Sequence, residues 1–351
     1  MDDADSCCHA LQEGFAVRIL HICAGWQEWN GAANIARMIM DEQRREGHEV
    51  SFATWARVRD LRAADEVWIH CGWLPCLWWA ALWARKAKWM PEACYDPVRL
   101  KFSAWKKRLV GPIERWALRR CEKIIATCEA EKEWIKAYLG RKCPEIEVTD
   151  VKRFFKLGVR RQGLGVSGDG KFEPCRSVEG ESEGFRVSGS ELAGDESNSQ
   201  LTTHNSQLNL LYLGRRHPLK GGEFLEAAVR QLQNSTRSTR STRFKIELKI
   251  VSNAFGEELE KVWDWCDVLV LPTLSENFGL VVAEALERGK SVITTDGAPV
   301  WGEGLNRVER VTEELRTGFD GRLIYLNGYR DGSDEKRVEL LQLAIMKLKG
   351  L

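Results

Sequence analysis

The first 150 residues alternate between short apolar segments and longer segments whose apolar positions recur every three or four residues. The short segments are typical of buried β-strands, and the longer ones are typical of helices that bury one face. Strands are predicted at 15–23, 48–54, 66–71, 123–128 and 145–149, and helices at 32–46, 75–86, 97–109 and 129–139. Since parallel strands need crossover helices, this alternation predicts a doubly wound α/β domain.

The same alternation resumes at residue 208. Strands are predicted at 209–214, 244–252, 267–273 and 291–296, and helices at 220–233 and 279–289. We therefore expect two Rossmann-like domains, at residues 15–155 and 208–332, and a C-terminal helix at 334–351.

Residues 161–206 break this pattern, with 8 Gly, 8 Ser and no Trp, Tyr or Ile. Such a segment buries too little apolar surface to offset its ordering entropy, so we expect a flexible insert or linker. Residues 163–168 match the spacing GxGxxG. Because no predicted strand precedes them and no helix follows, they do not indicate a dinucleotide site.

The composition is that of a globular protein, with 44% hydrophobic residues and a net charge of +1 from 52 Lys or Arg and 51 Asp or Glu. This balance excludes a uniformly basic nucleic-acid binder. However, residues 85–120 hold 11 Lys or Arg against 3 Asp or Glu, and 12 of the 15 Trp precede residue 135. Basic residues around Phe102, Trp105 and Trp116 suit an anionic membrane surface or a phosphorylated lipid-linked glycan. A solvated helix face explains the same charges equally well.

The N-terminal residues are acidic and polar and do not resemble a secretory signal, and the 11 Cys show no zinc-like spacing. We expect a cytoplasmic protein with reduced thiols, which can also lie peripherally on the cytoplasmic membrane face. Residues 67–84 have about the minimum length for a membrane span, but Gly72 and Pro75 interrupt them. They are better explained as a strand, a turn and a Trp-rich helix.

The strongest chemical pattern lies at 269–289, where a predicted strand ends at Pro272 and Gly279 opens an apolar helix. Ligands bind beyond the carboxyl ends of parallel strands, and a helix N-terminus suits a diphosphate. The loop between them carries Ser275 and Glu276. Glu284 lies further along the helix, where a surface position and a ligand contact are equally compatible with the sequence.

A second pattern lies at 214–221, GRRHPLKG, between a predicted strand and a helix. Arg215 offers a planar fork of donors and Lys220 a mobile point charge, and both suit phosphate oxygens. The spacing differs from that of a P-loop. A solvated basic turn is the alternative.

The order GR-x4-KG, P-x3-ENFG-x4-E and TTDGAP resembles the retaining family 4 glycosyltransferases of the GT-B fold. Residues 88–109 and 123–135 are similar to lipopolysaccharide-type sugar transferases in particular. The resemblance implies an α/β architecture of two Rossmann-like domains that face each other across a cleft.

The resemblance also implies roles for individual residues. Arg215 and Lys220 would neutralise the donor diphosphate, and Glu284 would bind the ribose. The sugar would be held by Glu276 and by the backbone from Asn277 through Phe278 to Gly279, while the amides of Leu280 and Val281 face the diphosphate. On the acceptor side, Asn30 and Gly31 would form the loop that admits the substrates, and His70 would lie near the transferred sugar. Considered alone, a histidine in this position is more often structural.

The implied activity is metal-independent transfer of a sugar, with retention, from a nucleotide diphosphate sugar to a glycan or lipid-linked acceptor in cell-surface polysaccharide or lipopolysaccharide biosynthesis. The nucleotide sugar is then a substrate, and no separate cofactor is implied. Two alternatives remain open. One is a catalytically silent GT-B binding or scaffold protein, and the other is a sugar epimerase or hydrolase on the same fold.

Overall fold

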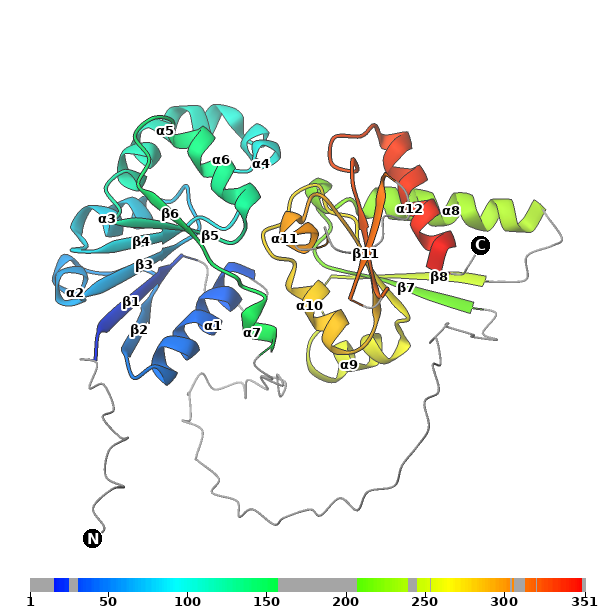
Figure 1. Ribbon diagram of the computed structural model, residues 1–351, viewed down its shortest axis with the longest axis horizontal. Helices are drawn as coiled ribbons and strands as arrows, with labels where there is room; N and C mark the ends of the chain where they lie inside the picture. The colour runs from blue at the N-terminus through cyan, green and yellow to red at the C-terminus, as the bar shows by residue number, and fades with distance from the viewer. Residues whose placement is uncertain are drawn as a thin grey trace, which may run out of the picture.

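The computed structural model describes residues 16–24, 31–156, 207–238, 245–252, 254–303, 305, 313–319 and 321–348. They form two α/β domains that lie side by side, each built on its own six-stranded sheet (Figure 1). The insert predicted at 161–206 and the loop residue Asn30 lie outside the described residues.

The first sheet has the strand order β2-β1-β3-β4-β5-β6, and all of its strand pairs are parallel. Its strands are β1 (Arg18–Cys23), β2 (Glu49–Ala53), β3 (Glu66–His70), β4 (Ala87–Met90), β5 (Lys123–Ala126) and β6 (Glu145–Val148). The helices of this domain are α1 (Gly31–Arg45), α2 (Val58–Ala63), α3 (Pro75–Trp83), α4 (Pro97–Lys101), α5 (Ala104–Leu118), α6 (Glu129–Leu139) and α7 (Arg153–Lys156). Helix α1 lies on one face of the sheet, and α5 and α6 lie on the other (Figure 1).

The second sheet has the order β11-β12-β10-β9-β7-β8, with β11 antiparallel to β12 and the other pairs parallel. Its strands are β7 (Gln207–Leu213), β8 (Lys245–Val251), β9 (Val268–Leu271), β10 (Ser291–Thr295), β11 (Leu315–Gly318) and β12 (Leu323–Leu326). The helices are the short 3-10 helix η1 (Pro218–Lys220), α8 (Gly222–Ser238), α9 (Gly256–Trp265), α10 (Leu280–Glu287), α11 (Pro299–Gly302) and α12 (Asp334–Leu348).

Alternate residues of the central strands enter two separate hydrophobic clusters. Leu211 and Leu269 pack on one face of the second sheet with α9 and α10, whereas Leu210 and Val270 pack on the other face with α8 and α12. A strand buried on both faces must be apolar at successive positions, which is why these strands appear in the sequence as continuous apolar runs.

Several elements differ from those expected. The single helix predicted at 97–109 is two helices, because Ser103 adopts a left-handed conformation (φ 53°) between α4 and α5. Strand β4 was not predicted, since Lys residues alternate with apolar residues at its start. The antiparallel edge strand β11 was not predicted either. The segment 67–84 is divided between β3 and α3, and among the described residues no helix is long and apolar enough to cross a membrane.

The strand order of the second sheet determines where its ligand site lies. From β7 the chain adds β8 on one side and then returns to add β9 on the other side. The loops that follow β7 and β9 therefore diverge at the carboxyl ends of adjacent strands, and this topological switch point is the usual ligand-binding position of a doubly wound sheet.

Candidate active site

The basic turn after β7 and the loop after β9 are joined by close backbone contacts. The carbonyl of Leu219 accepts hydrogen bonds from the backbone of Leu274 (2.8 Å) and from the hydroxyl of Thr273 (2.9 Å). Gly221 has a φ of 64°, and a Cβ atom there would lie 2.0 Å from the carbonyl oxygen of Pro272. Glycine is therefore required where the two loops meet.

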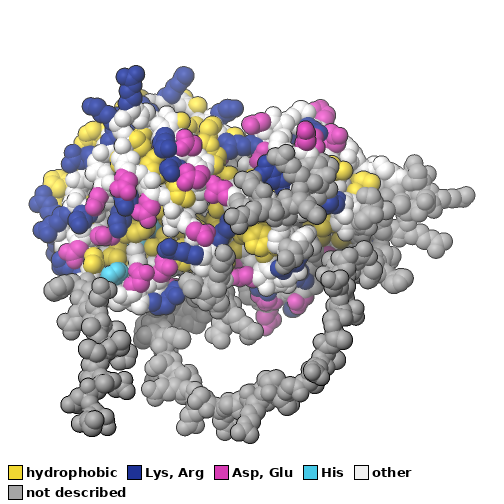
Figure 2. Space-filling view, in the orientation of Figure 1, with side chains coloured by type: hydrophobic (Ala, Val, Ile, Leu, Met, Phe, Trp, Pro, Cys, Tyr) yellow, Lys and Arg dark blue, Asp and Glu magenta, His cyan; other side chains and the backbone are white. Residues whose placement is uncertain are grey.

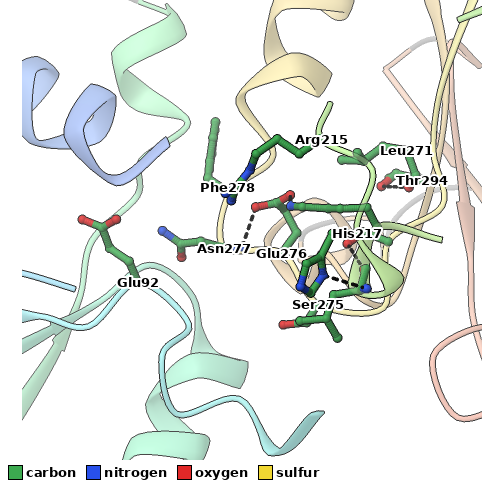
Figure 3. Close-up of polar contacts among 12 residues, drawn as sticks. Glu92, Arg215, His217, Leu271, Ser275, Glu276, Asn277, Phe278 and Thr294 are labelled. Carbon is green, nitrogen blue, oxygen red and sulfur yellow. Dashed lines mark hydrogen bonds and ion pairs between the residues drawn. The ribbon is translucent and has the colours of Figure 1, made fainter. Parts of the chain in front are cut away.

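The predicted phosphate-binding lysine and sugar-binding glutamate meet in this position. The ammonium of Lys220 forms an ion pair with the carboxylate of Glu276, whose other oxygen accepts the backbone N–H of Asn277 (3.1 Å). Burial alone would raise the pKa of Glu276, but the positive charges of Lys220 and Arg99 outweigh it and lower the pKa below its usual value. Arg215 extends from the basic turn toward Glu276 (Figure 3). Positive groups thus lie around one partly buried carboxylate.

Helix α10 begins directly beyond this pair. Gly279 adopts a left-handed conformation (φ 70°) and precedes the first helical residue, Leu280. The amides of Leu280 and Val281 belong to the first turn, whose N–H groups lack intrahelical partners and form the positive end of the helix dipole. Glu284 lies one turn further along and is half-buried. The arrangement suits an anionic ligand at the helix N-terminus.

Phe278 has a different role from its neighbours. Its side chain is buried and stacks on Phe155 of the first domain, with ring centroids 5.2 Å apart, while its carbonyl accepts a hydrogen bond from the Trp301 indole. The aromatic ring at this position therefore fixes the loop against the opposite domain.

His70 ends β3, and its side chain bonds to residues of the first domain. It is completely buried, and its two ring nitrogens lie 2.9 Å from Nδ1 of His21 and 3.1 Å from a carboxyl oxygen of Glu92. Burial lowers the pKa of His70 to about 3. Gly31 opens α1, as expected for the end of the glycine loop.

Two polar residues that the sequence did not single out, Asp96 and Arg99, connect the first domain to this site. The fully buried carboxylate of Asp96 accepts a hydrogen bond from Ser275 and forms an ion pair with Arg330. Arg99 donates from Nε to the hydroxyl of Ser275 (2.9 Å). Asp96 and Arg99 lie in the segment PEACYDPVR after β4, together with Glu92. Polar residues directly after a buried strand were the available signal, but β4 itself was not recognised.

Thr127, at the end of β5, supplies another contact between the domains. Its hydroxyl lies 2.8 Å from Oδ1 of Asn277 and 2.7 Å from a carboxyl oxygen of the buried Glu131. Asn277 is thus held by the first domain as well as by its own loop. Within the described residues, no group of three or more His, Cys, Asp or Glu is arranged to hold a metal ion.

Two family models match the chain, a glycosyl transferase 4-like domain at residues 51–150 and a glycosyl transferases group 1 domain at residues 207–314. The fold is similar to that of sucrose-phosphate synthase from Thermosynechococcus elongatus (14% identity, TM-score 0.55, covering 95% of this chain and 90% of that chain). It is also similar to a UDP-forming trehalose-phosphate synthase from Burkholderia xenovorans (10%, 0.53, 94% and 91%) and to the Anabaena protein HepE in complex with UDP-glucose (13%, 0.51, 95% and 91%). A search of curated protein sequences found no significant match.

The two family models fall on the two sheets, and the chain belongs to the family 4-type glycosyltransferases of the GT-B fold. The fold and family expected from the sequence are thus confirmed, and the protein is a glycosyltransferase.

Proposed function

We propose that the protein transfers a sugar from a nucleotide diphosphate sugar to an acceptor hydroxyl, with retention of the anomeric configuration. The observation that carries this proposal is the joint position of Lys220, Glu276 and the α10 N-terminus at the switch point of the second sheet. Arg215 and Lys220 face the diphosphate, Glu276 and Asn277 bind the sugar, and Glu284 binds the ribose.

In the proposed reaction, the bond between the sugar C1 and the diphosphate oxygen breaks, and its electron pair remains on the diphosphate. The acceptor oxygen forms the new bond to C1 from the same face and loses its proton to the departing phosphate oxygen. Negative charge develops on the diphosphate, and the two cations and the helix dipole stabilise it where it appears. When the diphosphate binds, Lys220 can leave Glu276 for the phosphate, and Glu276 is then available to a sugar hydroxyl.

We first predict the effect of substitutions in the donor site. Lys220→Met and Glu284→Gln should each lower sugar transfer by at least about 100-fold while the protein still folds cooperatively, because each removes a donor contact. Lys220→Met also breaks the ion pair with Glu276 and should lower the melting temperature. Arg215→Gln should also be impaired. Arg216→Gln is the matched control from the same turn, since the Arg216 guanidinium pairs with Glu226 of α8 (3.0 Å). Full activity of both the Lys220 and Glu284 variants would contradict the assignment.

The assay begins with a thermal-shift screen against ADP, UDP and GDP and their sugars, because a ligand that binds the folded state raises its stability. The donor selected in this way, carrying a labelled sugar, is then incubated with cell-envelope lipid and glycan extracts. The anomeric configuration of the product, read from its NMR couplings, tests retention. Release of sugar or an isomerised nucleotide sugar without any acceptor would indicate the hydrolase or epimerase alternative. No turnover with any extract would indicate the silent binding protein.

For the acceptor, we propose a glycan carried on a lipid, as in cell-surface polysaccharide or lipopolysaccharide biosynthesis, reached at an anionic membrane surface. The supporting feature is an apolar stripe along α5, formed by Trp105 (68% exposed), Leu109 (74%), Ile113 (47%) and Trp116 (47%). Their spacing of four, four and three residues places all four on one side of the helix. Phe102 (41%) extends the stripe toward the second domain, where its ring contacts His217.

The charge around the stripe is complementary to an anionic bilayer. Lys and Arg side chains gather over α4 and α5, with hydrophobic side chains among them (Figure 2). The exposed basic residues of this region are Lys101, Lys106, Arg108, Arg119 and Arg120. Glu114, the single acidic residue of α5, is fully buried and accepts hydrogen bonds from the Tyr95 hydroxyl (2.6 Å) and the Trp73 backbone (2.9 Å). No acidic side chain of α5 therefore opposes binding, and Glu114 helps to fix the orientation of the stripe.

We predict that the protein floats with vesicles that contain phosphatidylglycerol and remains unbound with purely zwitterionic vesicles. Trp105→Ser combined with Leu109→Ser should abolish flotation, because both side chains would insert at the interface. Leu343→Ser, which changes an exposed leucine of α12 (42%), is the matched control and should float normally. Equal recovery with both vesicle types, or normal flotation of the double variant, would contradict the membrane proposal.

A further inference from the structure

A chain of four buried polar side chains runs through the first domain, from α1 to the space between the domains. Oε1 of Gln43 lies 2.8 Å from Nε2 of His21, Nδ1 of His21 lies 2.9 Å from Nε2 of His70, and Nδ1 of His70 lies 3.1 Å from Glu92. The exposed fractions of these residues are 7%, 0%, 0% and 4%. Buried polar groups normally have hydrogen-bond partners, and here the four side chains are partners of one another.

The direction of the hydrogen bonds along this chain follows from its first member. The amide oxygen of Gln43 can only accept, so Nε2 of His21 carries a proton, and the orientation of this amide sets the direction of the whole chain. In a neutral imidazole the other nitrogen is then an acceptor, so Nδ1 of His21 accepts from Nε2 of His70. Nδ1 of His70 is left without a proton, and the contact with Glu92 requires the carboxyl to donate. Glu92 is therefore a neutral carboxylic acid.

The surrounding charges agree with this assignment. Burial lowers the pKa of His21 and His70, which keeps both rings neutral. Burial also raises the pKa of Glu92 well above its usual value, the nearby Glu131 raises it further, and the positive charge of Arg99 opposes the shift. The thiols of Cys71 and Cys94 are the other titratable groups beside Glu92. The hydrogen bond with Cys23, together with burial, raises the pKa of Cys71, and burial raises that of Cys94, so both thiols are neutral.

The backbone holds Glu92 in an unusual position. Glu92 and Ala93 are consecutive non-glycine residues with positive φ values of 56° and 59°. Such conformations cost free energy and are concentrated at functional sites, where the fold enforces a particular side-chain direction. Here the turn after β4 presents Glu92 to the second domain.

An incompletely bonded amide lies opposite Glu92. Asn277 is 8% exposed, and its Nδ2 atom is buried without a hydrogen-bond partner among the described residues, while Oδ1 contacts Thr127. The amide points across the gap between the domains toward the Glu92 carboxyl (Figure 3). A buried amide without a partner is unfavourable, and a bound hydroxyl would supply the missing partner.

We propose that Glu92 is a sugar-binding residue of the first domain: its carboxyl proton bonds to His70, and its other carboxyl oxygen accepts a hydrogen bond from a hydroxyl group of the transferred sugar opposite Asn277. His70 and His21 are positioning residues, because His70 accepts the hydrogen bond from the Glu92 O–H and leaves the other carboxyl oxygen to the sugar. This inference rests on the proposed function, because it assumes that the sugar moiety of the donor lies beside Glu276 and Asn277. A neutral Glu92 is no nucleophile, which agrees with attack by the acceptor itself.

The test measures how much the sugar adds to donor affinity. Calorimetry gives the Kd of the full-length protein for UDP and UDP-glucose, ADP and ADP-glucose, and GDP and GDP-mannose, and the pair with the largest affinity ratio is kept. Glu92→Ala should reduce that ratio about tenfold and leave the affinity for the bare diphosphate unchanged, because one hydrogen bond to the sugar is lost. Glu92→Gln is neutral, can donate to His70 through its NH2 group and can accept from the sugar through its oxygen, so it should restore most of the ratio. Glu257→Ala, at an exposed position of α9, is the control for an unrelated carboxyl.

The pH dependence tests whether the protonated carboxyl, bonded to His70, is the form that binds the sugar. In the wild type the ratio should fall as the pH rises through the raised pKa of Glu92, since the carboxylate has no proton to bond it to Nδ1 of His70 and is no longer held in place. In Glu92→Gln the ratio should not change with pH. An unchanged ratio in Glu92→Ala, or equal pH profiles in the wild type and Glu92→Gln, would overturn the proposal. If no nucleotide sugar binds the wild type better than its diphosphate, the proposed donor function fails first, and the inference fails with it.

Discussion

The ion pair between Lys220 and Glu276 in the candidate site differs from an ordinary ion pair on the protein surface. Their side chains are 19% and 17% exposed, and Glu276 is held ionised although burial favours its neutral form. Two charges brought together in a partly dry site stabilise the protein only while both remain charged. A ligand that binds Lys220 must therefore also offer a partner to Glu276. The proposed sugar diphosphate offers its phosphate to Lys220 and a sugar hydroxyl to Glu276.

The lowered pKa of Glu276 predicts a pH-dependent contribution to stability. Because the folded-state pKa lies below the ordinary value of 4.5, the contribution is present above that value and is lost as the pH falls through the folded-state pKa. Glu276→Gln should therefore be about 1–3 kcal/mol less stable than the wild type at pH 7, and the difference should narrow toward pH 3.5. Urea unfolding at the two pH values measures it.

The control for this experiment is Glu133→Gln, whose exposed pair with Lys136 lies on the surface of α6. Exposed pairs contribute little to stability, so this variant should match the wild type at both pH values. A difference between the wild type and Glu276→Gln that does not depend on pH would show that the ion pair is not its source.

Among the elements, the junction between η1 and the loop after β9 depends on one glycine. Gly221→Ala should cost at least about 3 kcal/mol, because a left-handed backbone and a collision with the Pro272 carbonyl add together. Gly256→Ala is matched in φ (55° against 64°), and its Cβ would contact nothing within 4 Å, so it should cost about 1 kcal/mol. Urea unfolding distinguishes them. Equal losses would mean that the loops can separate without cost.

The sequence predicted elements well where an apolar run was continuous and poorly where it was short. Strand β9 is apolar throughout and β1 is apolar except for Arg18 and His21, and both were recognised. In β4 apolar residues alternate with Lys, and the short apolar run of β12 follows no predicted helix, so neither was recognised. The break between α4 and α5 was not predictable, because Ser103 has no intrinsic preference for the left-handed conformation. It follows from the packing of both helices.

The site was predictable to the extent that its residues directly follow strands that the sequence shows. Lys220 and Glu276 each follow a recognisable strand, and the parallel topology brings those strand ends together. Glu92, Asp96 and Arg99 were missed, because their importance depends on the opposite domain. His70 was assigned to the site from its place at a strand end, but the sequence could not show that its ring points inward to His21.

At the scale of the whole molecule, the two sheets do not have separate interiors. One hydrophobic cluster includes Ile125 and Phe154 of the first domain together with Leu271 and Phe278 of the second. Around it, Asp96 reaches Ser275 and Arg330 across the boundary. The domains therefore meet through both apolar packing and buried charge, close to the proposed donor site.

The stacking of Phe155 on Phe278 has a consequence for engineering and for the diversification of such enzymes. Recombining the second half of this chain with an unrelated first half would transplant the motif around Glu276 but leave Phe278 without its counterpart. A hybrid with a new donor preference must then inherit residues 153–156 along with the loop around Glu276. The exchange of donor specificity between such enzymes by recombination is thus constrained by the short helix α7, which contacts no substrate in the proposed mechanism.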